Sequence, residues 1–258
     1  MLKPTSSKLK ASLPNTAAVI LAAGRGSRMQ AKRKNKVAFV IKGEPMITRT
    51  ANSLRLAGVG QLIAVVGFAA DSVKAALGSE VTYVNQEAQL GTGDAIKCAI
   101  PPLAPNITNV LSVYGDDSAF YPPELYVEMI EKIENSGASL LFLTINKEDP
   151  LGLGRIVRDQ DGKVLRIVEE KNATEAEKKI TEINTGFYCF RRDFLEKYIG
   201  EIKKNPISGE YYLTDMVEIA LEHGQKVETH QADSSIWHGV NNRSDFAKAR
   251  AKLKNDYE

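Results

Sequence analysis

Apolar residues occur in short continuous runs, separated by segments in which they follow helical spacing. The first run, 17–23, reads A-A-V-I-L-A-A, the pattern of a strand buried on both faces in a parallel sheet. Further buried strands are predicted at 62–66, 81–84, 110–114 and 139–145. Helices are predicted to begin at Pro45, Asp71, Asp94 and Pro123. Strands that alternate with helices in this way predict an α/β fold with a mostly parallel central sheet flanked by helices.

The pattern changes after Pro150. Two alternating runs on either side of Asp161-Gly162 predict a β-hairpin. Further elements are predicted as a short charged helix at 174–179, an apolar strand at 187–190, helices at 193–199 and 215–222, a strand at 227–231 and a last helix at 245–254. We therefore expect a flexible tail at 1–16 and one domain at 17–258. Within it, a half at 17–145 and a half at 146–243 share one sheet, and a C-terminal helix occupies 244–258.

A glycine-rich, basic loop follows the first apolar run. It reads G-R-G-S-R-M from Gly24 and continues as Q-A-K-R-K-N-K to Lys36. Glycines permit a tight turn with space beside the backbone, and exposed amides and cationic side chains can face an anion. A buried strand that leads into such a loop is typical of phosphate binding. The loop is neither a P-loop nor a complete dinucleotide fingerprint, and a solvated basic turn without a ligand would also explain its composition.

Two more polar loops follow predicted strands, at 85–94 and at 115–117. In open parallel sheets, ligands bind at the carboxyl ends of the strands. Three polar loops at strand ends therefore predict one binding site on a single edge of the sheet.

Composition narrows the class of protein. The 258 residues are 43% hydrophobic and 26% charged, which predicts a large core and argues against disorder. A net charge of +2 argues against a general nucleic-acid surface, although the basic cluster at 32–36 leaves such a binder as an alternative. Cys98 and Cys189 lack metal-ligand spacing, and no secretory or membrane-spanning segment is predicted. We expect a cytoplasmic protein without membrane contact and leave its oligomeric state open.

The motifs in these loops resemble one family. L-A-A-G-R-G-S-R-M at 21–29 resembles the signature loop of the sugar-1-phosphate nucleotidyltransferases. Q-E-A-Q-L-G-T-G at 86–93 is similar to the uracil-reading segment of the bacterial N-acetylglucosamine-1-phosphate uridylyltransferases. Further matches follow in order: Y-G-D at 114–116, G-L-G-R-I at 152–156, V-E-E-K at 168–171, E-I-N-T-G at 182–186, G-E-Y-Y-L-T-D at 209–215 and G-V-N-N-R at 239–243.

The resemblance implies a Rossmann-like nucleotidyltransferase fold whose C-terminal, sugar-binding portion contains the predicted hairpin. It also implies transfer of UMP from UTP to N-acetylglucosamine 1-phosphate, giving UDP-N-acetylglucosamine for nucleotide-sugar and cell-envelope biosynthesis, with release of pyrophosphate. The β-helix acetyltransferase domain of the bifunctional members is not found in this sequence, so we expect the uridylyltransferase activity alone.

The resemblance implies a role for each matched residue. The nucleotide is held by Leu21, Ala22, Ala23 and Gly24, and the uracil by Gln86, Gly91 and Thr92. The catalytic cations that face the triphosphate are Arg28 and Lys36. The sugar is held by Gly154, Glu169 and Asn184, and Mg²⁺ by Asp116 and Asn241.

The implied chemistry agrees with these residue types. Phosphoryl-type transfer depends on positioning and on charge neutralisation rather than on a covalent nucleophile. Mg²⁺ prefers oxygen ligands and keeps several waters, so one carboxylate, one amide and substrate phosphates suffice. Two alternatives remain: an enzyme for another sugar or polyol phosphate or another nucleotide, and a nucleotide-sugar-binding module with impaired catalysis.

Two positions depart from the family pattern. Asn35 stands where the family has proline before the catalytic lysine, in a loop that is one residue longer, so Lys34 is an alternative to Lys36. Asp117 follows the predicted metal ligand Asp116, where the family has an apolar residue. A second carboxylate there is expected to alter metal affinity or to raise one of the two pKa values. The pair Tyr211–Tyr212 is assigned to packing.

Overall fold

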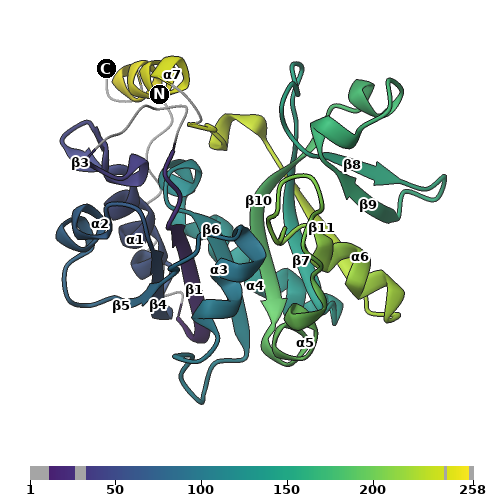
Figure 1. The fold of residues 1–258 in the computed structure, drawn as a ribbon, viewed down its shortest axis with the longest axis horizontal. Helices are drawn as coiled ribbons and strands as arrows, with labels where there is room; N and C mark the ends of the chain where they lie inside the picture. Colours follow the sequence, from purple (N-terminus) through teal and green to yellow (C-terminus); the bar gives the residue numbers. More distant parts are fainter. Residues whose placement is uncertain (1–11, 27–32, 241–242, 256–258) are drawn as a thin grey trace.

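A mixed β-sheet runs through the middle of the computed structural model, which describes residues 12–26, 33–240 and 243–255 (Figure 1). Its strand order is β11-β7-β10-β6-β1-β4-β5; off this path, β8 pairs with β10, and β9 pairs with β8. The strands of this sheet are β1 (Leu13–Ala22), β4 (Val59–Val66), β5 (Thr82–Asn85), β6 (Asn109–Tyr114), β7 (Leu140–Asn146), β8 (Arg155–Arg158), β9 (Val164–Val168), β10 (Glu182–Arg191) and β11 (Val227–Ala232).

The sheet is mostly parallel, as predicted. β1 lies in the interior of the sheet and pairs in parallel with β4 and with β6. β5 continues the parallel arrangement beside β4, and β11 is parallel to β7. β10 is antiparallel to both of its neighbours, β6 and β7. The register places Leu21 opposite Val65 and Tyr114, so the loops after β1, β4 and β6 begin at one level of the sheet.

Helices cover both faces of the sheet, and β1 contributes alternate residues to each face. Ala18 and Ile20 pack with α1, α2 and α4, whereas Ala17 and Val19 pack with α3, α5 and α6. Burial on both faces explains why the apolar run is unbroken rather than alternating. The helices are α1 (Met46–Leu56), α2 (Ala70–Leu77), α3 (Thr92–Ala99), α4 (Pro123–Ser136), α5 (Arg192–Tyr198), α6 (Asp215–Glu222) and α7 (Arg243–Asn255).

The predicted hairpin is confirmed by β8 and β9, which pair antiparallel on either side of Asp161-Gly162. Two other expectations are corrected. β1 begins at Leu13, so residues 13–16 belong to the sheet and not to a tail; Thr16 is buried and pairs with Asn109 on β6. The charged helix expected at 174–179 is a single 3-10 turn, η5 (Glu177–Lys179).

A smaller hydrophobic cluster lies beside the carboxyl ends of the strands. It contains Ile41 of the short hairpin β2–β3 (Val40–Ile41 and Glu44–Pro45), Met46 at the start of α1, Val240, and Ala249 on α7. Phe39 and Phe246 extend the cluster with an edge-to-face contact, at 5.9 Å between ring centroids. This packing attaches the end of the described chain to the first half of the sheet. Among the described helices, none combines the length and the hydrophobicity needed to cross a bilayer.

Candidate functional site

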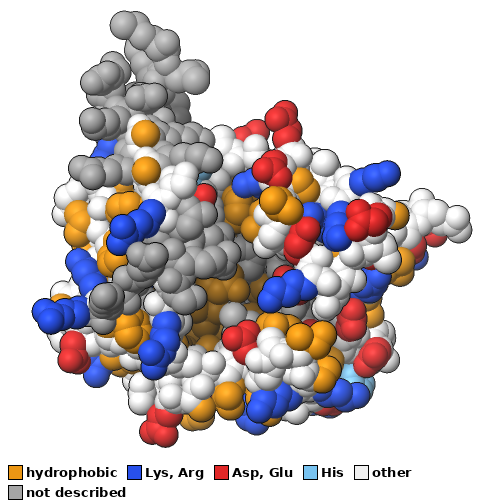
Figure 2. Space-filling view, turned by 45° about the horizontal axis from the view of Figure 1, so that its top comes forward, with side chains coloured by type: hydrophobic (Ala, Val, Ile, Leu, Met, Phe, Trp, Pro, Cys, Tyr) orange, Lys and Arg blue, Asp and Glu red, His pale blue; other side chains and the backbone are white. Residues whose placement is uncertain are grey.

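A cavity of about 650 Å³ lies at the carboxyl ends of β1, β5 and β6, and a second of about 330 Å³ adjoins it. The two share Lys36, Tyr114, Asp116, Glu169 and Asn184 as lining residues. Figure 2 shows a hollow near the centre of this face, with hydrophobic side chains at its floor and charged side chains around the described part of its rim. The three polar loops therefore meet at one edge of the sheet, as their positions after parallel strands predicted.

An ion pair between Lys36 and Asp116 lies where the two cavities meet. Asp116 follows β6 and is only 3% exposed, and its Oδ2 atom pairs with the Lys36 ammonium. Lys36 belongs to η2 (Lys36–Ala38), and its Nζ also donates a hydrogen bond to the Val240 carbonyl at 2.9 Å. Because an unpaired buried carboxylate would cost several kcal/mol, Asp116 depends on this cation while no other positive group is bound.

Asp117 binds the other backbone polar group of Val240, its N–H. Its Oδ1 accepts a hydrogen bond from the Val240 backbone N–H at 3.0 Å. Burial, and then the charge of Asp116, raise the pKa of Asp117 to about 7, while the Lys36 ammonium opposes this shift. The expected rise of one of the two pKa values is therefore found at Asp117. Asn241, which follows Val240, lies outside the described residues.

Asn35 stands where the family pattern has proline, and its side chain fixes the loop by hydrogen bonds. Its buried amide Nδ2 donates to the carbonyls of Ala22, Gly24 and Phe68, at 2.8, 3.2 and 2.8 Å. Its backbone N–H donates to Ser72 Oγ at 2.9 Å. Asn35 thus ties the end of β1 to the segment after β4 and fixes where the next residue begins. That residue, Lys36, lines both cavities, whereas Lys34 is exposed and lines neither, so the geometry favours Lys36 over Lys34.

The loop after β5 forms one wall of the larger cavity. Gln86 is 4% exposed, and its amide Nε2 donates to the Gly91 carbonyl at 2.9 Å and to Asp94 Oδ2 at 2.7 Å. Gly91 has φ +102°, and a Cβ there would lie 2.6 Å from the Tyr211 carbonyl oxygen, so this position requires glycine. Thr92 Oγ1 accepts a hydrogen bond from the Leu213 N–H at 2.9 Å. Segment 209–215 is therefore docked directly against the loop at 86–93.

The three residues predicted to hold a sugar converge in the smaller cavity. The Asn184 backbone N–H donates to the Gly154 carbonyl at 2.9 Å, and a Cβ on Gly154 would lie 3.5 Å from Glu169 Oε1. The Asn184 side chain donates to the Tyr188 hydroxyl at 2.7 Å, which fixes its orientation. Burial raises the pKa of Glu169, and Arg155 and Lys171 oppose the shift. The Glu169 carboxylate and the Asn184 amide are thus polar side chains of this group that line the cavity.

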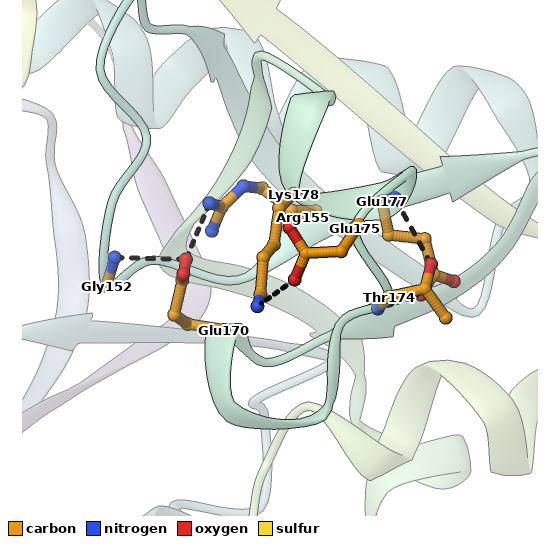
Figure 3. Close-up of polar contacts among 7 residues, drawn as sticks. All are labelled: Gly152, Arg155, Glu170, Thr174, Glu175, Glu177 and Lys178. Atoms are coloured by element: carbon orange, nitrogen blue, oxygen red, sulfur yellow. Dashed lines mark hydrogen bonds and ion pairs between the residues drawn. The ribbon is translucent and has the colours of Figure 1, made fainter.

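Arg155 follows Gly154, and its buried guanidinium donates to the Leu153 carbonyl of the same loop. Figure 3 shows Arg155 beside Glu170. Arg155 is 1% exposed and donates to Glu170 Oε2 at 2.6 Å, and the Gly152 N–H donates to the same oxygen at 3.1 Å. Figure 3 also shows Lys178 paired with Glu175, an exposed pair in the same segment. The Arg155–Glu170 pair thus joins the loop at 152–154 to the end of β9.

Twelve of the fourteen predicted site residues lie within the described chain, and all twelve line one of the two cavities. They are Leu21, Ala22, Ala23, Gly24, Lys36, Gln86, Gly91, Thr92, Asp116, Gly154, Glu169 and Asn184. Arg28 and Asn241 lie outside the described residues. The roles assigned to these residues remain predictions.

Among the lining residues that were not predicted as site residues are four with charged or aromatic side chains on the wall of the larger cavity: Arg25, Tyr114, Glu210 and Tyr212. All four fall within motifs that carry the family resemblance, which is the signal that would have found them. Tyr212, assigned to packing with Tyr211, faces the larger cavity instead. Tyr114 packs against Gly186, where a Cβ would lie 2.1 Å from the Tyr114 ring, so this close approach also requires glycine.

The fold and the site define an α/β protein with a ligand cavity at the carboxyl ends of its strands. Residues 17–256 match the model of the nucleotidyl transferase family, and the chain therefore belongs to that family.

Curated relatives agree with this family. The chain is 41% identical over 240 residues to the bifunctional protein GlmU of Geobacillus thermodenitrificans, covering 92% of this chain and 51% of the relative. It is 38% identical over 243 residues to the bifunctional protein GlmU of Exiguobacterium sibiricum, and this match covers 93% of this chain and 53% of the relative. The chain thus spans about half the length of these relatives.

A solved structure shares the fold. It is a putative glucose-1-phosphate thymidylyltransferase from Bacillus anthracis, in complex with a sucrose. The match has a TM-score of 0.76 at 22% identity and covers 93% of this chain and 96% of that one.

Removing Glu170 should destabilise the protein, because it leaves the buried Arg155 cation without its carboxylate. We expect Glu170→Ala to lower the free energy of unfolding, because the Arg155 cation is buried and loses a charged partner. The matched control is Glu175→Ala, which breaks the exposed pair with Lys178 in the same segment and should cost less than about 0.5 kcal/mol. Urea denaturation measures both. Equal effects of the two substitutions would contradict the assigned importance of the buried pair.

Asp215 should make stability depend on pH. Burial, and then the charges of Glu218 and Glu169, raise its pKa to about 6, from 3.8. The folded state then holds this proton more tightly than the unfolded state, so the contribution of Asp215 to stability declines as pH rises from 4 to 7. Over that range, the free energy of unfolding of Asp215→Asn should rise by about 1 kcal/mol relative to that of the unchanged protein. The full effect is larger, but partial exposure of Asp215 screens much of it.

Urea denaturation at several pH values measures this gain. The control is Asp193→Asn, which makes the same substitution at an exposed position in the first turn of α5. A pH-independent difference for Asp215→Asn would contradict the prediction.

Proposed function

We propose that this protein transfers UMP from UTP to N-acetylglucosamine 1-phosphate, giving UDP-N-acetylglucosamine and pyrophosphate. The observation that carries the proposal is the adjoining pair of cavities, with the Lys36–Asp116 ion pair between them. The larger cavity carries the loop that resembles a uracil-reading segment, and the smaller one carries Gly154, Glu169 and Asn184. The relatives called GlmU, at about 40% identity, support the same assignment.

In the proposed reaction, a phosphate oxygen of the sugar phosphate attacks the α-phosphorus of UTP. The bond from that phosphorus to the oxygen bridging to the β-phosphate breaks, and pyrophosphate leaves with the electron pair. Lys36 and Arg25, both on the cavity wall, would stabilise the negative charge that develops, and Arg28 is proposed to add a third cation. The two cavities would hold the two substrates in line, which supplies much of the rate enhancement in phosphoryl transfer.

We propose that Asp116, with Asn241, holds Mg²⁺. The donor type fits, because the Asp116 oxygens are hard ligands at a strand end, and the oxygen that faces Lys36 is shielded from solvent. Within the described ranges, no three His, Cys, Asp or Glu side chains converge to form a complete metal site. A Mg²⁺ ion held by Asp116 and Asn241 would take its remaining ligands from water and substrate phosphates. When bound, Mg²⁺ neutralises charge on the phosphates.

In the smaller cavity, Glu169 and Asn184 would bind the sugar. An ionised Glu169 accepts hydrogen bonds from ring hydroxyls, and the Gly154 position lacks a side chain that would fill the space beside it. The buried Arg155–Glu170 pair would keep these groups in place when the site is empty.

A pyrophosphate-release assay tests the reaction. Purified protein with Mg²⁺ is tested with UTP, dTTP, CTP and ATP, each against N-acetylglucosamine, glucosamine and glucose 1-phosphates. We expect the highest kcat/KM for UTP with N-acetylglucosamine 1-phosphate and a loss of at least about 100-fold in Asp116→Asn. Higher turnover with another pair would overturn the substrate assignment. Nucleotide binding in a thermal-shift assay without any pyrophosphate release would indicate a binding module instead.

The two candidate lysines provide a matched comparison. Lys36→Met removes the cation that lines both cavities and should lower kcat by about 100-fold or more. Lys34→Met removes an exposed cation two residues earlier and should leave kcat within about twofold, as expected for a solvated charge. Steady-state kinetics measures both, and thermal unfolding verifies that each variant is folded. A larger loss in Lys34→Met would transfer the catalytic role to Lys34.

A further inference from the structure

The side-chain amide of Gln86 is held in one orientation by two groups that can only accept hydrogen bonds. Its Nε2 atom donates to the Gly91 carbonyl at 2.9 Å and to the Asp94 carboxylate at 2.7 Å. A backbone carbonyl and an ionised carboxylate cannot donate in return. Exchanging the two ends of the amide would therefore place its oxygen against two other oxygens at a position that is 4% exposed.

This orientation leaves the Gln86 Oε1 atom for a ligand. Gln86 lines the larger cavity. Both hydrogen bonds that hold its side chain are made by Nε2, and no described group donates to Oε1. Oε1 is also absent from the buried polar atoms that lack a partner, so it retains contact with solvent. A fixed carbonyl in this position accepts from a ring N–H. Uracil and thymine present such an N–H at N3, whereas cytosine presents a bare nitrogen there and would be repelled.

We infer that Asp94 is a positioning residue for nucleobase selection: it orients the Gln86 amide so that the site accepts uracil or thymine and rejects cytosine. The inference rests on the proposed function, because it assumes that a nucleobase occupies this wall of the cavity. Asp94 lies in the first turn of α3 and is not among the residues that line the cavity, so it acts through Gln86 and not by contact with substrate.

Removing the Asp94 carboxylate should weaken selection more than it weakens catalysis. In Asp94→Ala, one of the two acceptors that oppose the exchanged amide is gone, so Gln86 can present its NH₂ group to cytosine N3 at lower cost. The ratio of kcat/KM for UTP to that for CTP should fall by about tenfold or more, the effect of one hydrogen bond. At saturating UTP, kcat should stay within about twofold, and so should the KM for sugar phosphate, because the reacting groups are unchanged.

The experiment compares Asp94→Ala, Asp94→Asn and Asp71→Ala with the unchanged protein, using UTP, dTTP and CTP in the pyrophosphate-release assay. Asp71→Ala is the matched control, since it removes an exposed acid from the first turn of α2, another helix that follows a parallel strand. Its UTP-to-CTP ratio should remain unchanged. Asp94→Asn preserves the shape but supplies a group that can donate as well as accept, so its ratio should fall by a smaller factor than that of Asp94→Ala.

The outcomes separate this inference from the proposed function. An unchanged protein that releases no pyrophosphate from any nucleotide means that the proposed function fails. An active, UTP-selective protein whose ratio stays within twofold in Asp94→Ala overturns the inference alone. If Asp94→Ala does not fold in thermal unfolding, Asp94→Asn decides, and an unaltered ratio in that variant overturns the inference as well.

Discussion

The arrangement of the site depends on the burial of one carboxylate. Asp116 is nearly inaccessible to solvent at the end of β6, and a charge in that position is tolerated only with a cation in contact. Lys36 is that cation, and it comes from a different loop more than seventy positions earlier in the chain. The same ammonium binds the Val240 carbonyl, so one charged group ties together three segments that are far apart in sequence. Asn35 caps η2, and Lys36 is the first residue of that turn, so the position of Asn35 determines where the lysine lies.

A second constraint comes from the antiparallel strand. β10 lies between β6 and β7, both of which precede it in the sequence. This position places Asn184 beside the end of β6. The hydrogen bonds of Tyr211 and Leu213 to the loop at 86–93 attach the second half of the chain to the first half again, at the far wall of the larger cavity. Both halves therefore contribute to each cavity, and neither half carries a complete site.

Much of this could be predicted from the sequence, because burial leaves a direct record in the pattern of apolar residues. The run at 17–23 is apolar throughout because both faces of β1 are covered, and the polar loops after the strands meet because parallel strands end at the same edge. The pairing of β10 could not be predicted, since an apolar run at 187–190 carries no information on its neighbours or direction. The early start of β1 was missed because Pro14, Asn15 and Thr16 have low strand propensity or are polar, yet they extend the strand and Thr16 pairs in the sheet. The partners of Asn35 and Asp94 depend on three-dimensional contacts that no local pattern records.

The charge on the cavity walls bears on how a triphosphate could enter. Of the described residues that line the two cavities, Asp116, Asp117, Glu169 and Glu210 are acidic, and Arg25 and Lys36 are basic. Lys36 is already paired with Asp116, and the Arg25 guanidinium lies 5.5 Å from the centre of the Phe68 ring. The described part of the walls therefore carries more acidic than basic side chains, and its acidic groups disfavour a highly negative ligand. In the proposed reaction, Asp116 and Asn241 would hold Mg²⁺, which would supply positive charge beside the phosphates, and Lys36 would face the same phosphates from the cavity wall. On this argument, the buried Asp116 carboxylate needs a cation beside it, and in this structure the Lys36 ammonium is that cation.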